Sequence, residues 1–260
     1  MNILDTITAQ KRKEISAKKE TFPISLLEKS TLFSRDTVSL ANALSSSSTG
    51  IIAEHKRRSP SKSVINDRTM VQDVITGYEA AGACGISVLT DTPFFGGSLD
   101  DLLVARAATN MPLLRKEFII DTYQIYEAKA YGADAILLIA ACLTDTELRT
   151  FAALAEDLRL EVLLEVHDEQ ELERSLLPNV AMLGVNNRNL KTFTTSLQTS
   201  KNLATKIPDT YVKISESGLS NAEAIGELRA VGYQGFLIGE TFMKTDAPGN
   251  FAHEFIKKLR

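Results

Sequence analysis

Residues 135–165, AILLIAACLTDTELRTFAALAEDLRLEVLLE, contain one complete strand–helix–strand pattern. The short apolar runs at 135–139 and 160–165 have the length and composition of buried strands. Between them, residues 145–158 carry apolar side chains at helical spacing. Two buried strands that flank one amphipathic helix are typical of a parallel βαβ unit.

The same alternation extends over most of the chain. Candidate strands lie at residues 51–55, 85–90, 112–116, 135–139, 160–165, 181–186, 211–216 and 235–239. Helical stretches follow them, for example at 122–130 and 222–231. Eight such units predict a single α/β domain of the (β/α)8 type, a TIM barrel, which typically takes about 250 residues and fits a chain of 260. A doubly wound open sheet is the competing fold, but the glycine-rich fingerprint usual after its first strand does not follow residues 51–55.

The residues before the first strand have a different pattern. Ile3, Ile7 and Ile15 recur at helical spacing with basic residues between them, and residues 45–50 form a serine-rich break. We therefore expect residues 1–48 to be a helical extension packed on the barrel, and residues 49–260 to be the catalytic barrel. The basic run could bind nucleic acid, but the net charge of -4 favours a solvated helix face.

Composition excludes several classes of protein. The acidic total argues against nucleic acid or an anionic membrane as the main partner. Cys84 and Cys142 are far apart and form no CxxC motif, so two buried free thiols are expected rather than a metal or redox site. The polar N-terminus does not resemble a secretion signal, and the longest apolar run is too short to span a bilayer. We expect a soluble cytoplasmic protein without cofactor or metal, a monomer or a weak homo-oligomer.

Successive side chains of a strand point to opposite faces, so the side chains that face the barrel interior can be read by twos. The inward sets are Ile52, Glu54 and Lys56; Leu114 and Lys116; Leu163, Glu165 and His167; Met182, Gly184, Asn186 and Arg188; and Val212, Ile214 and Glu216. Each set is apolar at first and polar at the C-terminal end of its strand. Isolated buried charges are costly, and active sites of TIM barrels lie at the C-terminal mouth, so the pattern predicts a functional mouth. Mutual pairing should lower the pKa values of the carboxylates and keep the lysines protonated, which suits general acids better than a Schiff base.

A phosphate site is expected at the same mouth. In TIM barrels the loops after the seventh and eighth strands commonly hold a phosphate together with a short helix. Ser217 and Gly218 follow the seventh candidate strand, and Gly239 precedes residues 240–243, which could form that helix. Ser59 could add a hydroxyl group. Residues 220–223 are predicted to form a capping box in which Ser220 caps the next helix.

Several segments together resemble the indole-3-glycerol-phosphate synthase family, nearly from end to end. They are Ile51-Ile-Ala-Glu-His-Lys-Arg-Arg-Ser-Pro-Ser-Lys62, Thr90-Asp-Thr-Pro-Phe-Phe-Gly-Gly-Ser98, Leu113-Leu-Arg-Lys-Glu-Phe-Ile119, Leu163-Leu-Glu-Val-His167, Gly184-Val-Asn-Asn-Arg-Asn-Leu190, Ser215-Glu-Ser-Gly218 and Phe236-Leu-Ile-Gly239. Other phosphate-binding barrels share the glycine segments but not the first and third of these. Two positions depart from the family: His55 stands where an apolar residue is usual, and Ser63 where glycine is frequent.

The resemblance implies a carboxy-lyase of tryptophan biosynthesis. It would convert 1-(2-carboxyphenylamino)-1-deoxyribulose 5-phosphate to indole-3-glycerol phosphate, carbon dioxide and water. The matching catalytic positions are Glu54, Lys56, Lys116, Glu165, Asn186 and Glu216, with Lys116 as the general acid of ring closure. The matching substrate-binding positions are Ser59, Phe95, Phe118, Leu137, Arg188, Ser217, Gly218, Gly239 and Glu240. For Phe94, a wall of the aryl site and simple loop packing are both open.

Three other functions compete with this one. Another cofactor-free phosphate barrel, a sugar-phosphate isomerase or an aldolase, is the nearest, but neither cysteine is expected at a strand end on the mouth. In a metal hydrolase, Glu165 and His167 could be ligands, although only three histidines are present. A non-enzymatic barrel would leave the charged mouth unexplained.

Overall fold

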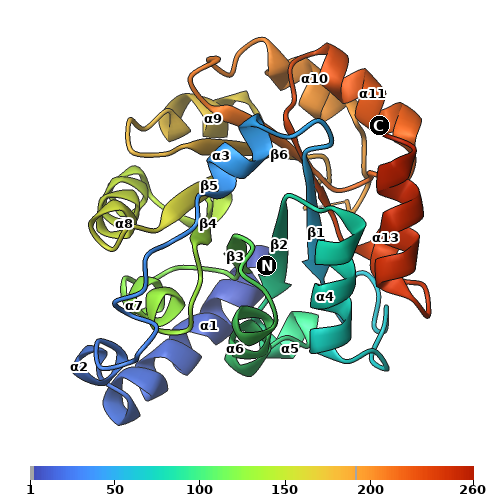
Figure 1. Cartoon of the computed structure of the whole chain (residues 1–260). Helices are drawn as coiled ribbons and strands as arrows, with labels where there is room; N and C mark the ends of the chain where they lie inside the picture. Colours follow the sequence, from blue (N-terminus) through green and yellow to red (C-terminus); the bar gives the residue numbers. More distant parts are fainter. Residues whose placement is uncertain (1–2, 191) are drawn as a thin grey trace.

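The computed structural model describes residues 3–190 and 192–260, so residues 1–2 of the predicted extension lie outside it. Eight parallel strands form a closed barrel in sequence order, with β1 hydrogen-bonded to β8. They are β1 (Ile51–His55), β2 (Gly85–Leu89), β3 (Leu113–Lys116), β4 (Ala135–Ile139), β5 (Glu161–Val166), β6 (Met182–Asn186), β7 (Val212–Glu216) and β8 (Gly235–Ile238). The predicted TIM barrel is confirmed, and each strand boundary lies within one residue of its predicted position (Figure 1).

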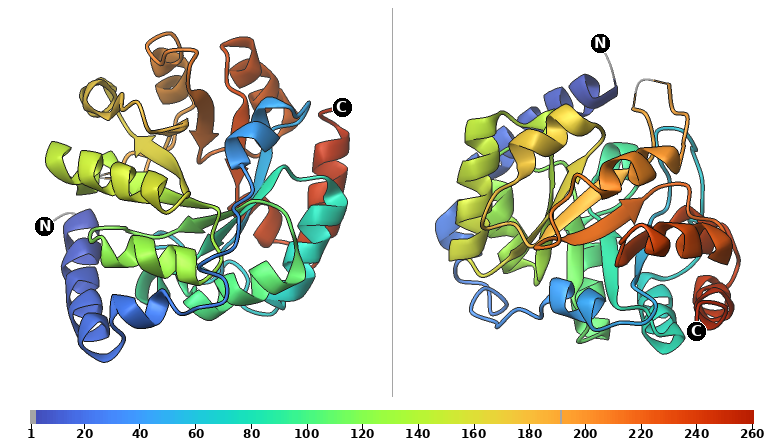
Figure 2. Two further views of the ribbon diagram at one scale, coloured as in Figure 1. Left: turned by 60° about the vertical axis from the view of Figure 1, so that its left-hand side comes forward. Right: turned by 90° about the horizontal axis from the view of Figure 1, so that it is seen from above.

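Helices surround the barrel on its outside (Figures 1 and 2). The helices and the 3-10 turn η1 that follow β1 are α4 (Val71–Ala81), α5 (Thr92–Phe95), α6 (Leu99–Ala108), α7 (Tyr123–Ala130), η1 (Ala140–Cys142), α8 (Asp145–Asp157), α9 (Glu169–Ser175), α10 (Gln198–Ala204), α11 (Ala222–Ala230), α12 (Glu240–Met243) and α13 (Pro248–Lys257). The last helix, α13, packs beside α4, so the end of the chain returns to the first βα unit (Figure 1).

Two apolar layers separate the inside of the barrel from its outside. Inward side chains such as Ile52, Leu163 and Ile214 form one cluster, whereas outward side chains such as Ile51 and Ile136 pack under the helices. This alternation follows from the period of two along each strand. The same alternation continues to the C-terminal ends of the strands, where the polar inward side chains lie.

The residues before β1 form α1 (Ile3–Thr21), α2 (Ile24–Leu27) and α3 (Leu40–Ser45). Both α1 and α2 pack along α7. Helix α3 instead lies under the N-terminal end of the barrel, where Leu40 and Leu44 sit against Gly85 and Gly235 at the starts of β2 and β8. The division of the chain into an extension (1–48) and a catalytic barrel (49–260) remains a prediction.

Three side chains outside the mouth differ from expectation or need an account. Cys84 and Cys142 are free thiols as expected, but they are half-buried rather than buried. Cys142 lies in η1 directly after β4, so it stands nearer the mouth than predicted. His55 is buried on the outward face of β1, where burial and the nearby Arg57 lower its pKa to about 4 and keep the ring neutral.

Candidate active site

A cavity of about 390 Å³ opens at the C-terminal ends of the strands. All of the predicted site residues line it: Glu54, Lys56, Ser59, Phe95, Lys116, Phe118, Leu137, Glu165, Asn186, Arg188, Glu216, Ser217, Gly218, Gly239 and Glu240. They come from strands and loops around the whole barrel, and the inward register brings them together. The structure fixes their positions, while their individual roles remain predictions.

Lys116 is at the centre of an ion-pair cluster. Its Nζ donates a hydrogen bond of 2.8 Å to Glu216 Oε2 and lies 3.4 Å from Glu165 Oε2. Asn186 donates to the other oxygen of Glu165 at 3.2 Å. Next to this cluster, Lys56 Nζ lies 2.7 Å from Glu54 Oε1. Two lysines with separate carboxylate partners can therefore serve two different proton-transfer steps.

The charges in this cluster follow from burial and pairing. Burial alone would lower the pKa of Lys116, but Glu216, Glu165 and Glu54 together raise it, so the ammonium form is kept. Burial likewise opposes ionisation of Glu165, yet Lys116, His167 and Asn186 lower its pKa as predicted. For Glu216 the prediction of a lowered pKa is wrong. Burial and the charges of Glu165 and Glu54 outweigh Lys116 and raise its pKa to about 7.

Two glycines make room for the carboxylates. A Cβ on Gly239 would collide with the Glu54 carboxyl group, and a Cβ on Gly184 would collide with Glu216 Oε1. Gly239 lies in the predicted phosphate region, and its contact with Glu54 is a separate reason for a residue without a side chain at this position. The sequence alone offers no signal for it, because the contact joins β1 to the end of β8.

The predicted phosphate region forms the other side of the cavity. Ser217 and Gly218 both have positive φ values, 68° and 79°, so the chain turns sharply after β7. Helix α12 begins at Glu240 as predicted, and the Glu240 side chain pairs with Lys62 at 3.2 Å. Lys244 also lines the cavity and was missed. The predicted capping box is wrong, because Asn221 rather than Ser220 caps α11, and Ser220 lines the cavity instead.

Aromatic and aliphatic side chains cover the remaining wall. The rings of Phe95 and Phe118 lie 5.8 Å apart between centroids at an angle of 40°. Leu137 and the α1 residues Ile3, Leu4 and Ile7 complete this apolar surface. Phe94 packs on the interior cluster and does not line the cavity, which fits the loop-packing alternative.

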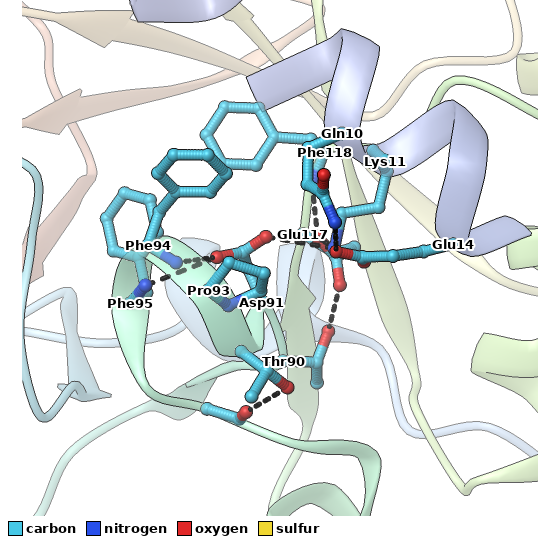
Figure 3. Close-up of polar contacts among 12 residues, drawn as sticks. Gln10, Lys11, Glu14, Thr90, Asp91, Pro93, Phe94, Phe95, Glu117 and Phe118 are labelled. Atoms are coloured by element: carbon cyan, nitrogen blue, oxygen red, sulfur yellow. Dashed lines mark hydrogen bonds and ion pairs between the residues drawn. The ribbon is translucent and has the colours of Figure 1, made fainter. Parts of the chain in front are cut away.

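Helix α1 is held over this wall by a buried lysine that sequence reasoning missed (Figure 3). Lys11 Nζ lies 2.9 Å from Asp91 Oδ2 and 3.3 Å from Glu117 Oε1. Asp91 in turn accepts hydrogen bonds from the backbone N–H groups of Phe94 and Phe95, so it caps α5. The sequence predicts a solvated face for the basic residues of α1, but Lys11 lies four residues from both Ile7 and Ile15 and so shares their buried face.

Fold and site together define a class of protein. A half-buried ammonium group among buried carboxylates, beside an apolar wall and opposite a glycine- and serine-rich turn, is suited to acid–base chemistry on an aromatic, phosphorylated small molecule. The metal-hydrolase alternative loses its basis, because the oxygens of Glu165 already contact Lys116 and Asn186. In the part of the chain that the structure describes, no helix is long and apolar enough to cross a membrane.

The chain belongs to the indole-3-glycerol phosphate synthase family, whose model matches residues 4–255. It is 46% identical over 259 residues to the indole-3-glycerol phosphate synthase of Bacteroides thetaiotaomicron, covering 100% of this chain and 99% of that protein. It is 44% identical over 252 residues to the enzyme of the same name from Polaromonas naphthalenivorans, covering 95% of this chain and 96% of that protein. The resemblance inferred from the sequence motifs is confirmed.

A more distant likeness concerns the fold alone. The structure of 3-hexulose-6-phosphate synthase from Salmonella typhimurium superposes with a TM-score of 0.64 at 10% identity, covering 81% of this chain and 98% of that chain. The structure of KGPDC from Streptococcus mutans gives a TM-score of 0.61 at 13% identity, covering 82% and 99%.

Proposed function

We propose that the cavity binds 1-(2-carboxyphenylamino)-1-deoxyribulose 5-phosphate and converts it to indole-3-glycerol phosphate, carbon dioxide and water, with Lys116 as the general acid of ring closure. The observation that carries the proposal is the position of Lys116. It is a half-buried amine, kept protonated by its carboxylate neighbours, in a cavity with an apolar wall and a glycine- and serine-rich turn. Such a cavity suits a substrate with an aryl ring at one end and a phosphate at the other.

Ring closure begins when the ring carbon that bears the carboxylate attacks the ketone of the sugar. The negative charge that develops on the ketone oxygen is neutralised by a proton from Lys116. Attack leaves an iminium group beside the carboxylate, and this built-in electron sink accepts the electron pair when carbon dioxide leaves. Glu165 and Glu216 hold the lysine in place for the first step.

Dehydration then needs an acid for the departing hydroxyl group and a base for the proton on the neighbouring carbon. The Lys56–Glu54 pair supplies a second ammonium group at the same cavity, separate from Lys116. We assign Lys56 as this acid, and Glu54 and Glu165 as the two carboxylates that can take the proton. The two lysines together supply the two protons that ring closure and dehydration take up.

Binding is assigned by the chemistry of each wall. The phosphate would be held by Ser59, by the turn at Ser217 and Gly218, and by the backbone at Gly239 and Glu240. The aryl ring would lie on Phe95, Phe118 and Leu137. Asn186 and Arg188 are placed for the hydroxyl and carboxylate groups of the substrate.

The wider proposals concern organisation and location. We propose that residues 1–48 serve as an extension of the catalytic barrel, with α1 as the roof of the site. We also propose that the protein acts in the cytoplasm as a monomer or weak homo-oligomer. The large apolar side chains that are exposed are spread over several elements, for example Leu26 on α2, Val104 on α6 and Phe251 on α13, which supports the absence of a broad apolar interface. Analytical ultracentrifugation at several concentrations tests the oligomeric state.

The function is tested by mixing the protein, in the presence of a chelator, with the carboxyphenylamino-deoxyribulose phosphate and following indole fluorescence. The chain contains no tryptophan, so the background is low. We expect turnover by the wild type and a loss of roughly 10²–10⁴-fold in kcat for Lys116→Ala, the usual contribution of a general acid. Lys257→Ala, which changes an exposed lysine on α13, is the matched control. A folded wild type without turnover would contradict the proposal.

A further inference from the structure

The proposed reaction does not balance in protons within the site. When the substrate carboxylate is ionised, loss of carbon dioxide and water consumes one proton for each turnover. One acid protonates the ketone oxygen and a second protonates the departing hydroxyl group, while only one proton is recovered from the neighbouring carbon. One acid of the site must therefore regain a proton from solvent in each cycle. The substrate, however, fills the mouth of the barrel.

A second cavity, of about 330 Å³, lies beside the first one. The residues that border both cavities, and so separate them, are Leu4, Asn186, Arg188 and Leu190. His167 and Glu171 line the second cavity but not the first, whereas Glu165 and Lys116 line the first but not the second. A substrate bound over Lys116 would leave the second cavity open to water.

A series of polar side chains, each within 3.4 Å of the next, joins the two cavities. Glu171 Oε2 lies 3.1 Å from His167 Nδ1 and also accepts the backbone N–H of His167 at 2.8 Å. On the other side of the ring, His167 Nε2 lies 3.3 Å from Glu165 Oε1, and Glu165 Oε2 lies 3.4 Å from Lys116 Nζ. Two local features build the series. Glu165 and His167 share a face at the end of β5, and Glu171 stands in the first turn of α9.

One ring nitrogen of His167, Nε2, has no evident structural role. Nε2 is buried and makes no aligned hydrogen bond to any described residue, although buried ring nitrogens are normally paired. The neighbouring Glu165 oxygen is within ion-pair distance but off the hydrogen-bond direction. Hydrogen bonds used in catalysis often become aligned only when the substrate is bound.

We propose that Glu171, His167 and Glu165 form a proton relay that recharges Lys116 from the second cavity while substrate fills the first. This inference rests on the proposed function of Lys116, with Glu54 taking the carbon proton and returning it to Lys56, so that Lys116 is the acid left for solvent to recharge. His167 takes a proton at Nδ1 from water or Glu171 and releases one from Nε2 to Glu165 Oε1. After rotation of its carboxyl group, Glu165 passes the proton to the neutral Nζ of Lys116. Only N–H and O–H bonds are exchanged: one proton moves from solvent to Lys116, and His167 passes from its Nε2–H to its Nδ1–H tautomer, which proton exchange with solvent reverses.

The charges around His167 suit this role. Burial alone would lower the pKa of the imidazole, but the hydrogen bond to Glu171 and the charges of Glu165, Glu171 and Glu216 raise it above its usual range. These groups belong to three different elements: β5, α9 and β7. The second cavity also brings Asp5, Asp168 and Arg188 to its walls. A ring surrounded mostly by carboxylates takes up protons readily near neutral pH.

The test is His167→Gln, assayed at saturating substrate in H2O and D2O, with and without added imidazole. We expect kcat to fall by roughly tenfold to a hundredfold, less than the roughly 10²–10⁴-fold typical of a group that exchanges a proton directly with the substrate, because His167 acts through Glu165 and Lys116. The solvent deuterium isotope effect on kcat should rise, imidazole should restore turnover, and KM should stay nearly constant because His167 does not border the substrate cavity. His253→Gln, an exposed histidine on α13, is the matched control.

Each alternative outcome has a distinct meaning. Unchanged kcat and isotope effect in His167→Gln, beside an active wild type, would overturn the relay and leave the proposed function intact. A loss of kcat without imidazole rescue and without a larger isotope effect would show a structural role and also overturn it. If His167→Gln does not fold, Glu171→Gln tests the same path, with Glu173→Gln on the exposed side of α9 as control. An inactive wild type would count against the proposed function itself.

Discussion

Single residues at the mouth are constrained by their neighbours as much as by the reaction. Lys116 stays charged because Glu216, Glu165 and Glu54 lie near it, whereas burial together with the charges of Glu165 and Glu54 makes Glu216 difficult to ionise. The sequence predicted which side chains point inward, because parity along a strand is local. It could not predict the pKa of Glu216, because that depends on distances between β1, β5 and β7.

Gly239→Ala tests one such constraint. The new methyl group would collide with the Glu54 carboxyl group and move it away from Lys56, so we expect kcat/KM to fall by roughly tenfold or more. Gly226→Ala on α11 is the matched control, because a Cβ there meets no atom within 4 Å. Replacing that helical glycine should leave kcat/KM unchanged and raise the free energy of unfolding by about 1 kcal/mol. Equal kcat/KM values for the two variants would show that the Glu54 carboxyl group can shift without loss of activity.

Among the structural elements, α1 differs most from its sequence-based interpretation. A period of 3.6 identifies a helix, but it does not say which other element covers the apolar face. The buried face of α1 carries Ile7, Lys11 and Ile15, and its charged member meets Asp91 and Glu117 at the ends of β2 and β3. The roof of the active site is thereby tied to the two loops that carry Phe95 and Phe118 (Figure 3).

Lys11→Met should therefore affect both stability and binding. Removing the amine takes the nearest cation from two buried carboxylates, Asp91 and Glu117, of which Glu117 still faces Arg115 at 3.7 Å. Breaking a buried ion pair in this way costs about 3–5 kcal/mol. Among molecules that remain folded, we expect a higher KM, because α1 and the aromatic wall lose their common anchor. Urea unfolding and steady-state kinetics measure the two effects, with Lys13→Met on the exposed face of α1 as control. A variant as stable as the control would contradict the role given to Lys11.

Similar limits apply to the loops between elements. The one-residue error at α11 arose because Ser220 and Asn221 are both good capping residues, and only the backbone geometry distinguishes them. The second cavity was not predicted at all, since it depends on how α1, β5 and the loop after β6 meet. The alternation of side chains along the strands thus predicted the charged strand residues that line the first cavity. The cap of α11 and the second cavity depend instead on backbone geometry and on packing between elements.

At the scale of the whole molecule, the raised pKa of Glu216 makes the free energy of unfolding depend on pH. The folded state keeps the proton up to about pH 7, whereas an unfolded glutamate loses it near pH 4.3. Between these values the folded state binds more protons, so this group lowers stability as pH rises through the window and contributes no further change above it. Comparison of Glu216→Gln with the wild type should show a difference in unfolding free energy that changes by on the order of 1–3 kcal/mol between pH 5 and 7.

Chemical denaturation at a series of pH values makes this measurement. Glu254→Gln, an exposed glutamate on α13, should follow the wild-type curve. A constant difference between Glu216→Gln and the wild type across the window would mean that Glu216 titrates at an ordinary pKa.

The pairing of β1 with β8 has a consequence for the order in which the protein can be assembled during synthesis. Leu44 of α3 rests against Gly235, and β1 bonds to residues 236–238, all of which leave the ribosome long after their partners. Neither the packing of α3 against the N-terminal end of the barrel nor the pairing of β1 with β8 can form until that late segment emerges. The nascent chain must therefore carry exposed apolar surface through most of its translation, a period in which such chains depend on chaperones to avoid aggregation.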